Sequence, residues 1–174
     1  MKKIITIALL FALSLVTHAQ EKVAWISFDE AIERNKTHPK PFLVDIYTDW
    51  CGWCKKMDRD TYAHPVIAAS INKNYHPVKI DGEGKDPITY KDYTFTYKSQ
   101  GRSGYHEFPA LLMNGKLSYP TTVVLNAEEK LLDRIPGYLD ARKMEMILAY
   151  FLEKDRKTKS WGQFSKQFKS KIEQ

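Results

Sequence analysis

Cysteine is scarce in this sequence, since the 174-residue chain has only Cys51 and Cys54. At most one intrachain disulfide can form, and the four-residue loop that it would close constrains the unfolded chain only weakly. A zinc site usually needs three or four protein ligands. The chain has no second Cys-x-x-Cys and no His-x-x-x-His pair, and Lys55 stands where a haem-attachment motif has histidine. A disulfide between these cysteines would therefore stabilise the fold only weakly, and redox chemistry is favoured over metal binding.

The motifs of several cofactor and ligand classes are also missing. No nicotinamide or flavin motif is present, and Gly82-Glu83-Gly84 does not open a helix as a phosphate-binding loop would. The formal charge is +6, but the basic residues are scattered and form no nucleic-acid-binding module. We therefore expect no cofactor, no metal and no nucleic-acid partner.

No apolar run reaches the roughly 20 residues that a membrane-spanning helix needs. The apolar stretch Ile4–Val16 follows Lys2-Lys3 and precedes Thr17-His18-Ala19, which places small residues at the −3 and −1 positions of a cleavage site before Gln20. This order is typical of a secretory signal peptide over residues 1–19. The sequence predicts a periplasmic or otherwise extracytoplasmic protein with the signal cleaved; the alternative is a membrane anchor.

The hexapeptide Trp50–Lys55 carries both cysteines and follows the apolar run Phe42–Tyr47, which has the composition of a buried strand. A thiol at a strand-to-helix junction lies where helix N-terminal amides favour the thiolate. Cys51 is therefore predicted to be an exposed nucleophile with a pKa below the free value of ~8.5. Cys54, one turn further on, is placed to resolve the mixed disulfide that Cys51 forms.

The remaining pattern predicts one α/β domain with a mixed sheet. A capping box at Ser27 and a cap at Asp140 mark two helix starts. The expected helices run from 28 to about 38, from 51 to about 60, from 65 onward, from 108 to 114 and from 141 onward; the expected strands are 42–47, 78–81, 121–125 and 131–135, with a hairpin strand over 93–97.

These residues resemble thioredoxin-fold proteins, and most closely the secreted thioredoxin-like group that includes the C-terminal domain of the bacterial disulfide transporter DsbD. The matching positions are Asp45, Trp50, Cys51, Gly52, Cys54, Lys55, Asp81, Tyr119-Pro120-Thr121 and Gly137. The resemblance implies a thioredoxin-like domain over 20–152, with helices flanking a central mixed sheet. The resemblance covers about residues 24–152 and includes a cis-proline loop, with an insert at about 82–114 before that loop. Residues 153–174 lie beyond the resemblance and are predicted from their charge and periodicity to be a basic amphipathic helical extension.

The chain departs from the family pattern in three places. Trp53 stands where a typical thioredoxin has proline, and the stretch from Asp81 to Pro120 is longer. The lysine that neighbours the buried aspartate in many thioredoxins aligns with Pro77, and Lys79 is close but displaced. The sequence therefore does not fix the reduction potential, the substrate surface or the proton pathway.

The resemblance also implies roles for individual residues. Asp45 lies in an apolar run, where burial raises a carboxyl pKa; the family suggests that it accepts the proton of Cys54, and the alternative is a purely structural carboxylate. Pro120 is expected to follow a cis bond, in a substrate-binding loop with Tyr119 and Thr121. An extended substrate strand could pair with the backbone of this loop.

Aromatic residues and one histidine around the motif have alternative roles. Trp50 and Trp53 flank Cys51 and could bind substrate; we expect Trp50 mainly to pack near Asp45 and Trp53 mainly to be exposed. His106 either tunes the thiolate or, more commonly for a lone histidine, is a hydrogen-bonded structural residue.

The C-terminal tail is expected to form a helix with one apolar face. Trp161, Phe164, Phe168 and Ile172 fall on that face, with lysines around it. The tail is expected to dock on the domain; a partner-binding or membrane-surface helix is the alternative.

The combined expectation is an extracytoplasmic thiol–disulfide oxidoreductase, reducing disulfides in substrate proteins and itself re-reduced by a membrane electron donor, as a monomer. Two alternatives stay open: a protein-binding module on a thioredoxin scaffold, and a disulfide oxidase or isomerase.

Overall fold

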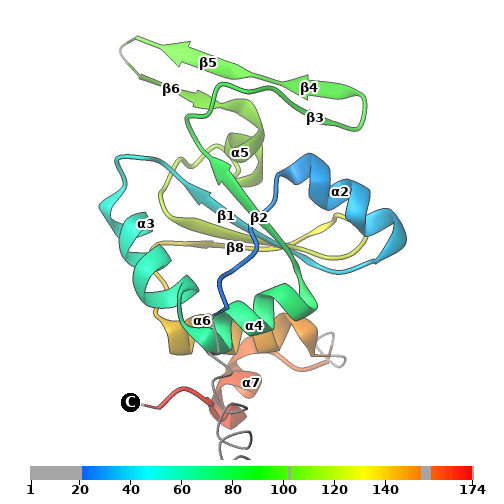
Figure 1. Ribbon diagram of the computed structural model, residues 1–174, viewed down its shortest axis with the longest axis vertical. Helices are drawn as coiled ribbons and strands as arrows, with labels where there is room; N and C mark the ends of the chain where they lie inside the picture. Colours follow the sequence, from blue (N-terminus) through cyan, green and yellow to red (C-terminus); the bar gives the residue numbers. More distant parts are fainter. Residues whose placement is uncertain (1–20, 102, 154–157, 174) are drawn as a thin grey trace, which may run out of the picture.

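The fold is seen in a computed structural model, which describes residues 21–101, 103–153 and 158–173. The predicted signal peptide over 1–19 lies outside these residues. A four-stranded sheet has the order β2-β1-β7-β8 (Figure 1). Its strands are β1 (Phe42–Tyr47), β2 (His76–Asp81), β7 (Thr121–Leu125) and β8 (Leu131–Pro136). Strand β2 is parallel to β1, and the other neighbours are antiparallel, so the sheet is mixed as predicted.

Strand β1 lies between β2 and β7, and its mostly apolar side chains are buried on both faces of the sheet. Phe42, Val44 and Ile46 pack into a core beneath the helix α2 (Phe28–Thr37), with Val78 of β2. Leu43 points to the opposite face and joins a second core. Asp45 alternates with these residues and so enters the second face, where it is buried.

Helices cover the two faces of the sheet in two layers (Figure 1). The second core lies under α3 (Gly52–Met57), the π-helical segment η1 (Asp58–Tyr62), α4 (Pro65–Asn74) and α6 (Ala141–Leu152). The short α5 (Glu107–Leu112) packs on the α2 side through Phe108. The cap at Asp140 is present, since Asp140 accepts from the Lys143 N–H. The capping box at Ser27 is formed only in part: Ser27 accepts from the Glu30 N–H, but the Glu30 carboxylate accepts from Arg34.

The insert forms two hairpins above α5 (Figure 1). They are β3 (Ile88–Tyr90) with β4 (Tyr93–Phe95), and β5 (Tyr97–Gln100) with β6 (Ser103–His106). The predicted single strand over 93–97 is therefore interrupted at Thr96. The reason is local: the Thr96 N–H donates to the Glu107 carboxylate at 2.8 Å, and the Glu107 N–H donates back to the Thr96 carbonyl at 3.1 Å.

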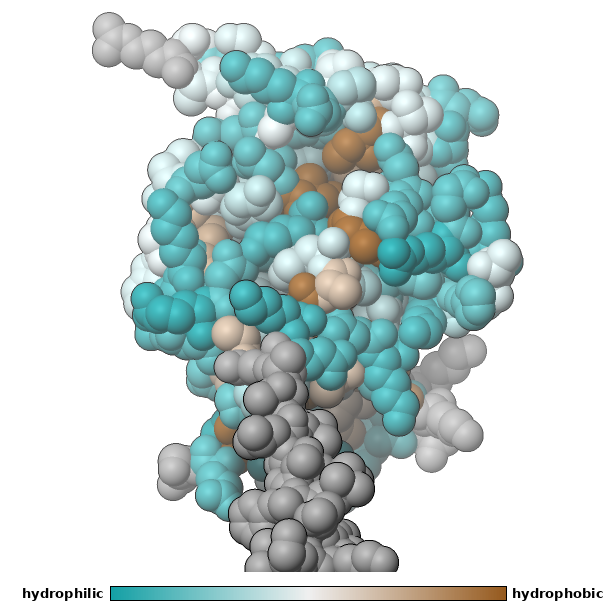
Figure 2. Space-filling view, viewed as in Figure 1, coloured by the Kyte–Doolittle hydropathy of each residue, from teal (hydrophilic) through white to brown (hydrophobic). Residues whose placement is uncertain are grey.

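The tail is docked on α6 in the structure. Helix α7 (Trp161–Gln167) places Phe164 with its ring centroid 5.3 Å from that of Tyr150. The buried Glu145 carboxylate accepts from the Lys171 N–H at 3.0 Å and from the Ser170 hydroxyl at 2.5 Å. None of the helices within the described ranges has the length and apolar character needed to cross a membrane. The face drawn in Figure 2 is mainly hydrophilic, with hydrophobic residues showing in small areas below the hairpins.

Candidate functional site

The two cysteines form a disulfide at the start of α3. Their sulfur atoms are 2.09 Å apart, and their Cα atoms 5.3 Å apart. Cys51 has extended backbone angles and is the N-cap, with its sulfur accepting from the Cys54 N–H at 3.1 Å. A turn from β1 delivers it, since the Cys51 N–H donates to the Thr48 carbonyl at 3.1 Å. The strand-to-helix junction predicted from the sequence is therefore the one observed.

Both cysteines are buried in this disulfide form, each with 4% of its surface exposed. The prediction that Cys51 is exposed is wrong for the oxidised protein, because its sulfur is bonded to Cys54 and turned toward the first turn of α3. The neighbouring Trp50 and Trp53 are instead exposed, at 65% and 59%. These two rings are the apolar surface beside the disulfide.

The two tryptophans have different neighbours. Trp50 lies in the turn after β1, outside the sheet, so the prediction that it packs near Asp45 is wrong. Its ring meets Tyr119 edge-on, with centroids 5.9 Å apart. Trp53 is exposed as predicted, and its ring centroid lies 5.5 Å from that of Tyr138. Each tryptophan beside the cysteine pair is therefore in contact with a second aromatic ring.

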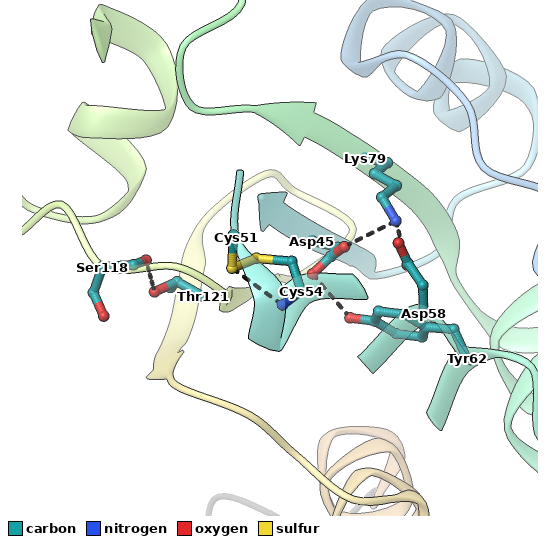
Figure 3. Close-up of a disulfide and its surroundings, with 8 residues drawn as sticks. All are labelled: Asp45, Cys51, Cys54, Asp58, Tyr62, Lys79, Ser118 and Thr121. Carbon is teal, nitrogen blue, oxygen red and sulfur yellow. Dashed lines mark hydrogen bonds and ion pairs between the residues drawn. A yellow bond between two sulfur atoms is a disulfide. The ribbon is translucent and has the colours of Figure 1, made fainter. Parts of the chain in front are cut away.

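The loop before β7 contains a cis peptide bond between Tyr119 and Pro120. Pro120 is buried, and its carbonyl accepts from the Gly137 N–H at 2.8 Å. Thr121 is buried at the start of β7, and its hydroxyl donates to the Ser118 carbonyl at 2.7 Å. Figure 3 shows this loop beside the disulfide. Tyr119, Pro120 and Thr121 are thus gathered at the site.

Gly82, just after β2, sets the position of the Tyr119 ring. A Cβ on Gly82 would lie 2.4 Å from Cε1 of Tyr119, so any side chain there would displace the ring. Burial raises the pKa of Tyr119 to about 12, and the charges of Glu83 and Asp81 act in the same direction. The sequence marked Gly82 only as a loop residue, because close approach between distant segments leaves no local signal.

Asp45 is the buried acid of the site, with 2% of its surface exposed. The Tyr62 hydroxyl donates to its Oδ1 at 3.2 Å, and Lys79 Nζ lies 3.5 Å from its Oδ2. Its pKa is raised to about 6, mainly by burial and also by the charge of Asp58, whereas Lys79 and the Tyr62 hydrogen bond partly offset this rise. In the close-up (Figure 3), Asp45 lies behind Cys54, with its carboxyl toward Lys79 and Tyr62.

Lys79 is not displaced from the aspartate, which corrects the alignment-based expectation. In the parallel register of β1 and β2, Lys79 is directly opposite Asp45, and Pro77 is opposite Leu43. The Lys79 ammonium also pairs with Asp58 and lies 5.0 Å from the ring centroid of Tyr47. The register between two strands depends on the whole sheet, so a one-dimensional alignment could not place this residue.

Asp58 and Tyr62 were missed by the sequence reasoning. They follow Cys54 at intervals of four residues, the spacing that puts side chains on one helix face. That spacing was the available signal, but it became meaningful only once β2 placed Lys79 against the same face.

His106 has a structural role. It is 1% exposed and caps α5, with Nδ1 accepting from the Phe108 N–H at 3.1 Å and Nε2 lying 3.0 Å from the Asp86 carbonyl oxygen. Burial lowers its pKa. This is the hydrogen-bonded alternative stated for it. No group of three or more His, Cys, Asp or Glu side chains within the described part of the chain is placed to hold a metal ion.

The chain is similar to known proteins both in sequence and in structure. Spermatogenesis-associated protein 20 of Rattus norvegicus is 25% identical over 92 residues, 52% of this chain and 12% of that protein. The thiol:disulfide interchange protein DsbD of Vibrio vulnificus is 37% identical over 38 residues, 22% of this chain and 6% of that protein. A solved thioredoxin of Thermus thermophilus superposes with a TM-score of 0.57 at 13% identity, covering 78% of this chain and 90% of that one.

The chain spans only 12 to 13% of the length of the first four curated relatives. The superposition on the Thermus protein shows that the fold is the thioredoxin fold. A model of the family Thioredox_DsbH, described as "Protein of unknown function, DUF255", matches residues 11–157. Because that match covers most of the chain, this protein belongs to the Thioredox_DsbH family.

Proposed function

We propose that this protein is an extracytoplasmic thiol–disulfide oxidoreductase that reduces disulfides in other proteins. The observation that carries the proposal is the Cys51–Cys54 disulfide at the first turn of α3, with the Tyr119–Pro120 loop beside it and a buried carboxyl behind it. A dithiol in this setting can accept and release two electrons without a cofactor.

In the first step the reduced Cys51 attacks one sulfur of a substrate disulfide. A bond forms between Cys51 and that sulfur, and the other substrate sulfur leaves as a thiolate that takes up a proton. The thiolate of Cys51 is stabilised by the backbone N–H of Cys54, which already points at its sulfur at 3.1 Å.

In the second step Cys54 resolves the mixed disulfide. Asp45 accepts the Cys54 proton, directly or through water, and the Cys54 thiolate attacks the Cys51 sulfur. The remaining substrate sulfur leaves as a thiolate, so two electrons have passed to the substrate and the Cys51–Cys54 disulfide is formed. With a pKa of about 6, Asp45 is mostly ionised at neutral pH and can act as this base.

The substrate surface is built around the disulfide. The exposed rings of Trp50 and Trp53 supply apolar contact area. The backbone of Tyr119, Pro120 and Thr121 supplies hydrogen-bonding groups for an extended segment. Both features fit a polypeptide substrate better than a small thiol.

The oxidised protein must be reduced again. We propose a membrane electron donor on the same side of the membrane as the protein, to which the predicted signal peptide delivers it. In the producing cell, the mature chain is expected in the extracytoplasmic fraction with its N-terminus at Gln20. Mass spectrometry of the fractionated protein measures this N-terminus. A chain that keeps Met1 and lies in the cytosolic fraction would contradict the proposed location.

The reaction is tested by mixing the pre-reduced protein with insulin and following the release of insulin thiols. The wild type is expected to transfer one pair of electrons per molecule, Cys51→Ser none, and Cys54→Ser to accumulate a mixed disulfide seen on a non-reducing gel. Ser103→Ala, a change on the exposed end of β6, is the matched control and is expected to behave as wild type. If wild type and Cys51→Ser are equally inert with several protein disulfides, the protein-binding alternative replaces the proposal.

A further inference from the structure

The ammonium of Lys79 is shared between two carboxylates of different exposure. One is Asp45, whose side chain is 3% exposed; the other is Asp58, whose side chain is 43% exposed. Lys79 itself is 18% exposed and lies between them (Figure 3). A single cation therefore balances an inner and an outer negative charge at the boundary between core and solvent.

Asp58 is fixed to the segment that carries Cys54. It is the first residue of η1, and its N–H donates to the carbonyls of Cys54 and Lys55. Its own carbonyl accepts from the Ala63 N–H at 3.1 Å, the π-helical bond that defines this turn. Asp58 therefore approaches Lys79 from the redox helix, whereas Asp45 approaches it from the sheet.

We propose that Asp58 is a positioning residue for the reaction, which draws the Lys79 ammonium away from Asp45 and so keeps Asp45 basic enough to deprotonate Cys54 near neutral pH. This inference deepens the proposed function and rests on it. Two effects act together: Asp58 offsets part of the positive charge that Asp45 experiences, and its own negative charge repels an ionised Asp45.

Two tyrosines of the described residues contact this pair directly. Tyr62 of η1 donates to Asp45, and Tyr47 of β1 packs on the Lys79 ammonium. The outer side of the pair opens into a surface pocket whose charged lining residues, besides Asp58 and Lys79, are Lys22, Lys55 and Arg59. Asp58 supplies the negative charge closest to Lys79 on this side, so its removal leaves the ammonium to act on Asp45 alone.

The test is an NMR titration of the Asp45 side-chain carboxyl in the oxidised protein, which needs no activity. Asp58→Asn is expected to lower the Asp45 pKa by about one unit, because an opposite charge within about 4–6 Å lowers a carboxyl pKa by one unit or more. Asp58→Glu keeps the charge and is expected to restore most of the wild-type value. Asp60→Asn is the matched control, since Asp60 lies on the same turn but pairs with Lys56 and Arg59.

The same variants are then compared in the reduction of insulin across pH 5 to 8. The midpoint of the resolving step is expected to move to lower pH in Asp58→Asn together with the Asp45 pKa. An unchanged or raised Asp45 pKa in folded Asp58→Asn overturns the inference, as does a pH profile that stays in place while the pKa moves. If instead the wild type reduces no substrate while the titration shifts as expected, it is the proposed function that fails.

Discussion

At the scale of single residues, the buried carboxyl of Asp45 is central to the proposed chemistry, and its ionised form also destabilises the folded state. Burial disfavours its ionised form, and the partial compensation by Lys79 and Tyr62 leaves the pKa at about 6, above the ordinary value of 3.8. The folded state therefore binds this proton more tightly than the unfolded state does. This tighter proton binding stabilises the folded state. Its contribution is fully present below about pH 4 and is lost as the pH rises through about 6.

Asp45→Asn is therefore expected to stabilise the protein at neutral pH. The gain in the free energy of unfolding is up to about 3 kcal/mol at pH 7, from 1.36 kcal/mol per pKa unit, and it shrinks to nothing below about pH 4. Urea unfolding of the oxidised protein at several pH values measures it. Asp92→Asn, at an exposed position of the insert, is the control. Equal or lower stability of Asp45→Asn at pH 7 would contradict the burial argument.

At the scale of elements, the segment made of α3 and η1 joins the redox pair to the proton-accepting side of the sheet. Cys54, Asp58 and Tyr62 recur every four residues, so this one segment carries the resolving sulfur, the outer carboxylate and the phenol that bonds Asp45. Strand β1 delivers Asp45 to the same place because its alternation turns Asp45 to the second face.

The C-terminal tail is a second element, held on α6 by the Phe164–Tyr150 ring contact and by a buried carboxylate. Glu145 of α6 is 7% exposed and accepts from the Lys171 N–H and the Ser170 hydroxyl. Ile172 then packs against the second core. The tail is held by a charged acceptor in a poorly hydrated position, where hydrogen bonds contribute more than at the surface.

Glu145→Ala is expected to lower the free energy of unfolding by about 2 kcal/mol, because hydrogen bonds to a charged group contribute about 1.5–3 kcal/mol. It is also expected to release the tail, seen as faster proteolysis after residue 158. Glu33→Ala is the control, since Glu33 pairs with Lys36 on an exposed helix face. A tail that stays protected in Glu145→Ala would show that Tyr150 and Phe164 suffice to hold it.

At the scale of the whole molecule, the central sheet separates the redox site and the tail from the hairpins of the insert. The disulfide, Asp45 and the tail belong to the side with the second core, whereas the hairpins of the insert are anchored through Phe95 on Phe108, with ring centroids 5.1 Å apart, on the other. The hairpins project above α5 and extend the molecule without contributing to the buried carboxyl site (Figure 1).

The direction of electron flow is a property of the whole redox unit. A strong oxidant has a stabilised reduced form. Here the negative charge of Asp45 at neutral pH opposes a thiolate on the neighbouring sulfur, so the reduced form gains little. Equilibration with glutathione at pH 7 is expected to give a potential of about −270 mV; a value of about −120 mV would identify an oxidase.

Local patterns in the sequence determined an α/β domain with a mixed sheet, the start of α3 at the cysteine pair, and the burial of Asp45 in an apolar strand, because these depend on neighbouring residues. The thioredoxin fold was implied by the resemblance of the motifs around Cys51 and Pro120 to that family. Only the tertiary structure placed Lys79 opposite Asp45, brought Asp58 to the same ammonium, turned Trp50 outward and buried the oxidised Cys51. The physical reason is that strand register and contacts between distant segments follow from packing the entire sheet, and no short stretch of sequence encodes them.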